Sequence, residues 1–528
     1  MNKKLLIHNN NVSKIDTYDV NLKFSKIKNI LNEIKEKEFD IIYIKDRLTT
    51  NYMEFTGLLL AYHIRLSTEL GYKKFVPIVI ISDLDGFTLN KITSFAKILF
   101  TKSIFVNNLP SKYMKLNNTN FKNEFLDKII IERPKDTSGN HDIANKWSIY
   151  KWSNLLSIES DVINKNKNQI ENTLYFKYLK VLNNNKVHEN IEILSATKEG
   201  KVLLIDDEWN KGWADVLTSI TKSESINFDY FDYDFKDKTK FNLLMQIQKK
   251  VVSFNPDVVI LDLRLAQGDH ETENIDDYTG IRILQKIHQI NAGIQVIMLT
   301  ATSKSTILER LYEKKILGYI KKEHPDDKNI DTIENINKLV SLIDKGLDRK
   351  YLKSIYDITV NIKMILDEDI FNKYNISIEK YESFWIKLEK ETQNIFDILD
   401  NNSQNKFIYA MVSIASSLET ILSIFINEKE MTFWDKEPYD CQYNALRCRI
   451  VKLFEKFGTK DNLDMKKLID KRNDYLHSRR NILVTDKEIV KWFKKLEKMI
   501  QIIDNPPKIR TYNVTNVLEN LQNMFNHK

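Results

Sequence analysis

The chain is poor in the residues that interrupt regular structure or cross-link small folds. Its 528 residues include 12 glycines, 8 prolines and 2 cysteines, whereas glycine and proline together make up roughly 12% of average proteins. This composition excludes collagen-like and proline-rich disordered chains and favours helices. We expect Cys441 and Cys448 to be small packing residues on one helix face, without a disulfide, as in a reducing cytoplasm.

Long apolar runs and a strong charge of one sign are also missing. No stretch approaches the run of about 18 apolar residues that a membrane helix needs, and the start, MNKKLLIHNNN, does not resemble a targeting signal. We therefore expect a soluble, cytoplasmic protein with no membrane partner. The net charge of +7 permits an RNA partner without requiring one.

Residues 201–322 alternate short apolar runs with amphipathic stretches, the pattern of a doubly wound α/β domain with a parallel sheet. The predicted strands are KVLLIDDE at 201–208, INFDYFDYD at 226–234, PDVVILDL at 256–263, QVIMLTAT at 295–302 and GYIKK at 318–322. The predicted helices cover 209–221, 238–254, 279–291, 304–317 and 329–345. In such a sheet, ligands bind beyond the carboxyl ends of the strands.

Charged and hydroxyl-bearing residues stand at those carboxyl ends. They are Asp206, Asp207 and Glu208 on the first strand, Asp262 on the third, Thr300 on the fourth, and Tyr319, Lys321 and Lys322 on the fifth. Carboxylates that converge at one sheet edge repel each other unless a hard cation lies between them, and ligation by oxygen alone suits Mg²⁺. A lysine and a hydroxyl beside that cation would complete a pocket for a phosphoryl group.

These residues resemble the receiver domain of bacterial response regulators, the phosphoproteins of two-component systems. The resemblance implies that Asp262 is the phosphoacceptor and that Asp206, Asp207, Asp262 and the backbone carbonyl of Arg264 hold Mg²⁺. It also implies that Thr300, Tyr319 and Lys322 sense the phosphoryl group, and that a sensor histidine kinase or another phosphodonor is a partner.

Two departures leave open a receiver-like sheet that has lost phosphorylation. Glu323 replaces the proline usual after the lysine, and the loop from Asp262 to Gly280 is long and acidic.

The first 110 residues contain a second, degenerate copy of the same pattern. DIIYIKDRL at 40–48 aligns with DVVILDLRL at 257–265, and TGLLLAYHI at 56–64 aligns with TGIRILQKI at 279–287. In this alignment Lys45 replaces the phosphoacceptor and Asn107 replaces the lysine. An ammonium group cannot accept a phosphoryl group in this chemistry, so we predict a pseudo-receiver that serves packing or partner recognition.

The segment between the two copies predicts two helices, at about 138–158 and 164–184. His141 lies in the first turn of the first helix, and the segment around it is similar to the phosphoacceptor helix of histidine phosphotransfer proteins. This similarity makes His141 a possible phosphotransfer site. The alternative is a dimerising or linking hairpin with Trp147 and Trp152 in its core.

From about residue 346 the pattern becomes all-helical, with predicted helices at 406–427, 439–457, 463–479 and 486–503. In the segment DKRNDYLHSRR, Asn473 and His477 are four residues apart and would share a helix face beside Arg472. An imidazole can transfer protons near neutral pH, and a guanidinium can hold a phosphate. These residue types suit RNA cleavage without a metal.

The motif is similar to the RNxxxH motif of HEPN ribonucleases, helical bundles that cut RNA at a site shared by two subunits. The resemblance implies Arg472, Asn473 and His477 as catalytic residues, RNA as substrate and a homodimer, with Glu419 as a polar companion. The alternatives are a structural or nucleotide-binding bundle, or a helix whose Arg472 pairs with Asp470 or Asp474 while His477 only packs.

The sequence therefore predicts a multidomain protein that combines α/β and all-α parts. We expect a pseudo-receiver at 1–120, a helical hairpin at 121–198, a flavodoxin-like receiver at 199–345 and a HEPN-like bundle at 346–528. The expected function is phosphorylation-controlled RNA cleavage by an endoribonuclease, and the HEPN resemblance alone suggests a role in antiphage or abortive-infection defence. The alternative is a non-catalytic phosphorylation-dependent scaffold or a phosphate sink.

Overall fold

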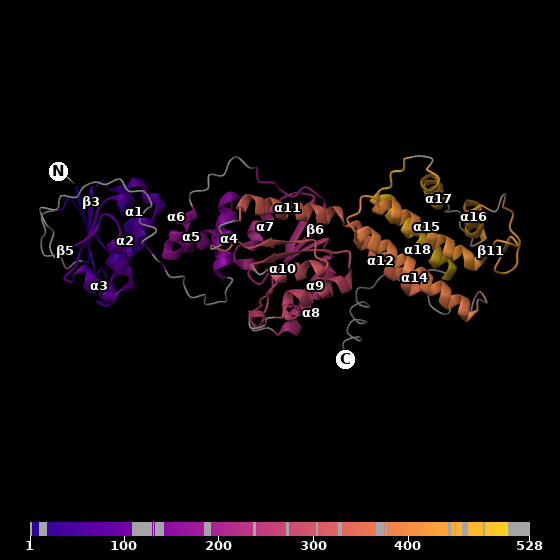
Figure 1. Ribbon diagram of the computed structural model, residues 1–528, viewed down its shortest axis with the longest axis horizontal. Coiled ribbons are helices and arrows are strands. Elements are labelled where there is room, and N and C mark those ends of the chain that lie inside the picture. Colours follow the sequence, from indigo (N-terminus) through magenta and orange to yellow (C-terminus); the bar gives the residue numbers. More distant parts are fainter. Residues whose placement is uncertain are drawn as a thin grey trace. The chain divides into compact units, whose positions relative to one another are not determined.

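A computed structural model describes most of the chain (Figure 1). The described residues are 3–9, 18–107, 129, 131, 142–183, 192–235, 239–270, 274–302, 305–325, 330–365, 374, 377–441, 445–456, 463–478 and 481–504. They fall into two compact units. The first comprises Met1–Ile193, Asn210–Ser219 and Lys322–Ile336, and the second comprises Leu194–Trp209, Ile220–Lys321 and Asn337–Lys528.

The first unit begins with a parallel five-stranded sheet of order β2-β1-β3-β4-β5. This order is that of flavodoxin-like folds. Its elements are β1 (Lys4–His8), β2 (Val20–Lys23), α1 (Ile27–Glu36), β3 (Ile41–Lys45), α2 (Thr56–Leu66), η1 (Thr68–Phe75), β4 (Ile78–Ile81), α3 (Gly86–Ile92), η2 (Ser94–Phe100) and β5 (Ile104–Asn107). The strands are nearly continuous apolar runs because both faces of such a sheet are covered. The predicted α/β fold of the first copy is confirmed.

Three helices follow where the sequence predicted two: α4 (Asp142–Leu155), α5 (Asp161–Asn172) and α6 (Leu174–Asn183). The prediction of one helix over 164–184 is wrong, because the chain leaves the helical path at Thr173. The α6 helix then packs on α2 and contributes Val181 to the core of the first sheet domain. Trp147 lies in the hairpin core, stacked on Phe176.

The second unit contains another parallel sheet, of order β10-β9-β8-β6-β7, which is the same topology as that of the first sheet. Its strands are β6 (Gly200–Ile205), β7 (Ile226–Tyr230), β8 (Val258–Asp262), β9 (Gln295–Thr300) and β10 (Gly318–Lys321). The intervening helices are η4 (Trp209–Lys211), α7 (Trp213–Ile220), α8 (Lys240–Phe254), η5 (Gln267–His270), η6 (Ile275–Asp277), α9 (Thr279–Ile290) and α10 (Ser305–Glu313), and α11 (Thr332–Asp348) follows β10. Each of the five predicted strands and five predicted helices is present, so the predicted doubly wound fold is confirmed.

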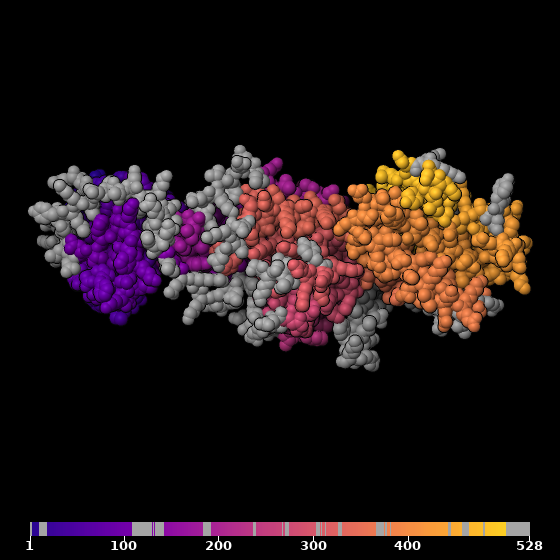
Figure 2. Space-filling model, in the orientation of Figure 1, coloured from indigo at the N-terminus to yellow at the C-terminus, as the bar shows by residue number. Residues whose placement is uncertain are grey.

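The rest of the second unit is a bundle of helices with one small hairpin of strands. Its elements are α12 (Tyr351–Ile365), α14 (Ile378–Asp400), α15 (Lys406–Phe425), β11 (Ile426–Asn427), β12 (Thr432–Phe433), α16 (Leu446–Lys456), α17 (Leu463–Leu476) and α18 (Asp486–Asp504). The two short strands were not predicted. In Figure 2 the orange and yellow side chains of this part form a continuous surface on the face shown.

The α15 helix is the central element of the bundle. By length and composition it could cross a membrane, with a mean hydropathy of 1.6, but 56% of that window is buried inside the protein. Its core residues Ile414, Leu418 and Ile421 pack in one cluster with side chains of the neighbouring helices. Its apolar character is therefore explained by burial within the bundle.

The cysteines do not occupy one helix face as predicted. Cys441 precedes α16 and Cys448 lies in it, their Cα atoms are 5.9 Å apart, and their sulfur atoms form a disulfide. The prediction of two separate packing residues is wrong, because Cys441 lies outside the helix and approaches the first turn of α16.

Candidate functional site

The register of the second sheet brings the predicted site residues to one edge. Ile205 of β6 lies opposite Leu261 of β8. The next residues, Asp206 and Asp262, are therefore neighbours at the carboxyl ends of these two strands. Asp262 in turn lies opposite Leu299, the residue before Thr300. The carboxyl ends of β6, β8 and β9 therefore carry two carboxylates and a hydroxyl side by side.

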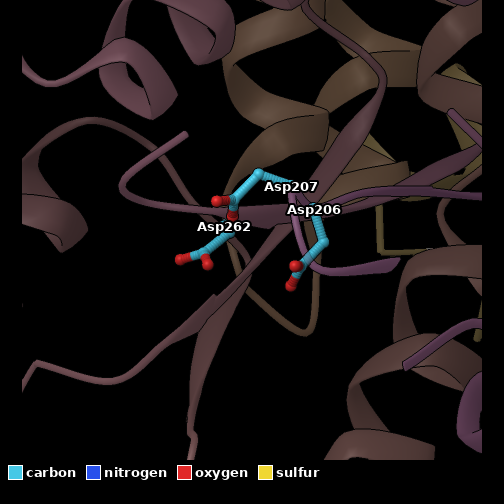
Figure 3. Close-up of side chains that lie close together, drawn as sticks. All are labelled: Asp206, Asp207 and Asp262. Atoms are coloured by element: carbon cyan, nitrogen blue, oxygen red, sulfur yellow. The ribbon is translucent and has the colours of Figure 1, made fainter. Parts of the chain in front are cut away.

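Three carboxylates gather at this edge (Figure 3). One oxygen from each of Asp206, Asp207 and Asp262 lies within 4.8 Å of the other two. Asp206 and Asp262 are buried, whereas Asp207 is at least partly exposed. Backbone N–H groups hold the buried pair: Glu208 donates to Asp206 Oδ1 at 2.8 Å, and Leu263 donates to Asp262 Oδ1 at 2.6 Å.

This set of ligand atoms fits Mg²⁺. All three groups are carboxylates with no nitrogen or sulfur among them, as a hard cation requires. Ionised carboxylates this close together repel one another, and a bound cation would offset that repulsion.

A glycine allows α9 to approach the end of strand β8. A Cβ atom at Gly280 would lie 2.4 Å from the carbonyl oxygen of Asp262 and 2.6 Å from that of Leu263. The Gly280 N–H donates to the Leu263 carbonyl at 3.1 Å. Gly57 has the same role in the first domain, where a Cβ atom would lie 1.9 Å from the Lys45 carbonyl oxygen. The structure thus confirms the alignment of Lys45 with Asp262.

The acidic loop after Asp262 is organised by a residue that sequence reasoning did not single out. Asp269 is fully buried and accepts hydrogen bonds from the backbone N–H groups of Leu265, Ala266 and Thr279. Lys240 Nζ lies 2.8 Å from its Oδ1 atom. The loop acidity alone gave no signal that one of its carboxylates would be buried.

The remaining predicted receiver residues are also described. Thr300 is buried at the end of β9, and its Oγ1 accepts the Thr302 N–H at 3.2 Å. Tyr319 is half-buried in β10, beneath Lys338. The Arg264 guanidinium donates to the Tyr278 hydroxyl at 2.9 Å. Lys322 directly follows β10 and is completely buried, with its Nζ 5.3 Å from the Trp213 ring centroid.

The first sheet carries basic residues where the second carries acids. Ile7 lies opposite Ile44, so His8 and Lys45 take the places of Asp206 and Asp262. Burial, followed by the charges of Lys45 and Lys23, lowers the pKa of His8. The hydroxyl position is retained, since Ser82 Oγ donates to Asp46 Oδ2 at 2.6 Å.

The predicted match of Asn107 with Lys322 is wrong by two residues. Ile81 lies opposite Lys45 as Leu299 lies opposite Asp262, and Asn107 is the partner of Ile81. Because Leu299 pairs with Ile320, Asn107 corresponds to Ile320.

In the helical bundle, the predicted catalytic motif lies at the end of α17. Arg472 donates from Nη2 to Glu419 Oε1 of α15 and from Nη1 to Asn473 Oδ1, both at 3.0 Å. Glu419 also interacts electrostatically with Arg449. Burial lowers the pKa of the Arg449 guanidinium, and the negative charge of Glu419 partly opposes this lowering. Glu419 is therefore the polar companion of the motif. Asp470 pairs instead with Arg447 at 3.3 Å.

His477 lies one residue beyond the helix, which ends at Leu476 rather than continuing to 479. Its N–H donates to the Asn473 carbonyl at 3.0 Å, and Ser478 then adopts a left-handed conformation with φ of 51°. The His477 side chain is exposed. The structure thus brings Arg472, Asn473 and Glu419 together and leaves the imidazole accessible at the helix end. His141 lies outside the described residues.

Both sheets share one strand order, with Asp206 and Asp262 at the edge of the second and His8 and Lys45 at the equivalent positions of the first. Residues 3–107 match the family model of the inactive receiver domain. The match agrees with a lysine at the acceptor position and confirms the predicted pseudo-receiver. It covers a minor part of the chain. No curated protein matches the chain.

Solved structures similar to this chain include receivers and response regulators. The signal receiver domain of a Luxo repressor protein from Vibrio parahaemolyticus is 20% identical, with a TM-score of 0.21, and the match covers 29% of this chain and 92% of that one. A LuxR-family two-component response regulator from Aurantimonas sp. SI85-9A1 is 16% identical, with a TM-score of 0.20, over 27% of this chain and 86% of that one. A LuxR-family DNA-binding response regulator from Staphylococcus aureus is 19% identical, with a TM-score of 0.19, and the match covers 28% of this chain and 98% of that one. TM-scores of this size assign neither fold nor function to the chain.

Proposed function

We propose that the second sheet domain is a phosphorylatable receiver that controls the helical bundle. The supporting observation is the cluster of Asp206, Asp207 and Asp262, whose oxygens lie within 4.8 Å of one another at the carboxyl edge of the sheet. The pseudo-receiver has lysine at the acceptor position, so Asp262 is the sole acceptor of the two copies in this proposal.

The residues of the cluster have separate tasks. A carboxylate oxygen of Asp262 attacks the phosphorus of a phosphohistidine or a small acyl phosphate donor. A new P–O bond forms, the bond from phosphorus to the donor breaks, and the donor leaves with the electron pair. Bound Mg²⁺ would supply charge neutralisation for the carboxylates and the phosphoryl oxygens. Asp206 and Asp207 would hold that ion, and Thr300 would donate to a phosphoryl oxygen.

Labelling with a small phosphodonor tests this proposal. We expect Mg²⁺-dependent incorporation at Asp262 in the full chain, lost in Asp262→Asn and with EDTA. Lys45→Met is the matched control, because it changes the equivalent position of the first copy and should leave labelling unchanged. Undiminished labelling of the Asp262→Asn protein would refute the assignment.

We further propose that the bundle cleaves RNA with Arg472, Asn473 and His477. The supporting observation is the chain of hydrogen bonds from Glu419 through Arg472 to Asn473, which fixes the guanidinium of a motif whose imidazole, on His477, is exposed. Arg472 would hold the scissile phosphate, and His477 would move a proton.

Cleavage requires two proton transfers. The RNA 2′-hydroxyl loses a proton and attacks phosphorus, while the leaving 5′-oxygen gains one. The products are a 2′,3′-cyclic phosphate and a 5′-hydroxyl. One copy of the motif supplies one histidine, so two copies in a homodimer would supply both groups.

Incubation with single-stranded RNA in EDTA, followed by mapping of the ends, tests the proposal. Cleavage with cyclic phosphate ends, absent in His477→Ala, would support it. No cleavage by the phosphorylated protein would favour the scaffold or phosphate sink instead. A role in antiphage defence rests on the HEPN resemblance and is tested by challenge of cells that express the parent or the His477→Ala protein.

A further inference from the structure

Glu323, which stands where receivers have proline, is a buried acid that accepts several hydrogen bonds. Its side chain is 2% exposed and faces helix α4. Trp152 Nε1 donates to Oε1 at 2.8 Å, and Lys151 Nζ donates to Oε2 at 2.6 Å. Ser148 Oγ donates to the Glu323 backbone carbonyl at 3.1 Å. Thr332 Oγ1 of α11 also donates to Oε2 at 2.9 Å, so α4 contacts both the backbone and the side chain of Glu323 and α11 adds one further bond.

A second set of contacts ties the same helix to the surroundings of Lys322. Trp213 Nε1 donates to Asn145 Oδ1 of α4 at 2.9 Å. The Trp213 ring meets the Trp152 ring edge to face, with centroids 5.5 Å apart, and the Nζ of Lys322 lies 5.3 Å from the Trp213 ring centroid. The α4 helix therefore contacts the residue after Lys322 and the aromatic ring beside its ammonium group.

The energetics of this arrangement are those of a pre-organised site. Glu323 would be costly to bury alone, and its hydrogen bonds to charged and neutral donors offset that cost. Each bond also restricts the backbone at residue 323, one peptide away from Lys322. A proline at this position could not make the side-chain bonds, so the departure from the receiver pattern has a structural role.

We propose that Glu323 couples the docking of helix α4 to occupancy of the phosphoryl site, so that each strengthens the other. The inference rests on the proposed receiver function and on the receiver resemblance, which implies that Lys322 pairs with the phosphoryl group. Glu323 acts as a positioning residue. It restrains Lys322 through the shared backbone and, by way of Trp152, through the Trp213 ring. The phosphoryl group would restrain Lys322 by pairing with its ammonium group. By thermodynamic linkage, phosphoryl occupancy must strengthen α4 docking by the same factor by which α4 docking strengthens phosphoryl binding.

Beryllofluoride with Mg²⁺ is the probe, and the full-length protein is titrated by calorimetry. Lys151→Met removes one donor of Glu323 from the solvent side, where the lysine side chain is 30% exposed. We expect beryllofluoride to bind at least about fivefold more weakly to this variant, the lower limit of ordinary allosteric couplings. Glu323→Gln should weaken binding further, and Lys151→Arg should restore it.

Lys146→Met is the matched control. Lys146 lies on the same helix with the same 30% exposure and forms an ion pair with Asp142 at 2.7 Å, away from Glu323. The affinity of the Lys146→Met protein for beryllofluoride should equal that of the parent protein. Equal binding by the Lys151→Met, Lys146→Met and parent proteins would refute the coupling while leaving the receiver proposal intact, and tighter binding by Lys151→Met would refute it as well.

Hydrogen exchange supplies the reciprocal measurement. In the parent protein, beryllofluoride should slow exchange of the α4 amides, by at least the factor that Lys151→Met costs in affinity. Unchanged exchange in a protein that binds the probe would refute the inference. Failure of the parent protein to bind beryllofluoride or to label at Asp262 would refute the receiver proposal itself, and the coupling with it.

Discussion

Gly57 and Gly280 provide a matched test of the two receiver-like sheets. Replacing Gly280 with alanine would place a Cβ atom 2.4–2.8 Å from backbone atoms of Asp262 and Leu263, and Gly57→Ala would bring one to 1.9 Å from the Lys45 carbonyl oxygen. Backbone atoms at a strand end cannot rotate away as a side chain can. Overpacking of this kind costs about 1–3 kcal/mol, so the opening of each sheet should become roughly 5- to 150-fold more frequent at 1.4 kcal/mol per factor of ten.

Hydrogen exchange of the amides in β3 and β8 measures this cost for each sheet separately. Gly280→Ala should speed exchange in β8 and reduce labelling of Asp262, because the backbone carbonyl of Asp262 must shift and its side chain would move with it. Gly57→Ala should speed exchange in β3 more strongly and leave labelling intact. Gly86→Ala is the control, since its nearest neighbour would be Leu99 Cδ1 at 3.8 Å. Parent-like exchange in both test variants would show that the helices do not approach the strands this closely.

Further predictions concern other parts of the chain. His477→Ala and Arg472→Ala should each lower the rate of RNA cleavage by about 10²- to 10⁴-fold while the protein stays folded by circular dichroism. Glu419→Gln should raise the Michaelis constant for RNA, because Arg472 loses its charged partner; equal kinetics would exclude a positioning role. Burial, aided by Lys177, lowers the pKa of His63 from 6.5 to about 3, so the unfolded state gains a proton first as the pH falls. The first domain should therefore lose stability from about pH 6.5 down to about 3, by on the order of 1 kcal/mol per pH unit, and His63→Leu should flatten that profile in hydrogen exchange. His141→Ala should leave labelling of Asp262 by a small phosphodonor unchanged, and loss of labelling would assign His141 a part in phosphoryl transfer.

The sheets and the carboxylate cluster could be predicted because their signals are local. Apolar runs define β6, β8 and β9, and residues at the ends of parallel strands must meet at one edge. Gly57 and Gly280 could be aligned because each follows its strand at nearly the same spacing. The same logic located Arg472 and Asn473 on one helix.

The failures come from properties that sequence patterns do not encode. Asn107 was aligned two residues away from its structural equivalent, and a two-residue shift preserves the alternation of faces that a strand pattern reveals. The break at Thr173 has no glycine or proline to mark it. Glu323 and Trp152 are 171 residues apart in sequence, so their contact has no local signal. The Cys441–Cys448 bond depends on how closely the chain approaches α16.

The contribution of α6 to the first domain determines where the chain can be cut. Lys177 of this helix is buried and donates to Ser67 at 2.7 Å, while Val181 fills part of the core beneath α2. A fragment that stops at residue 120 would expose that apolar surface to water and leave the α2 face uncovered. Fragments for expression or crystallisation of the pseudo-receiver should therefore extend through Asn183, the last residue of α6.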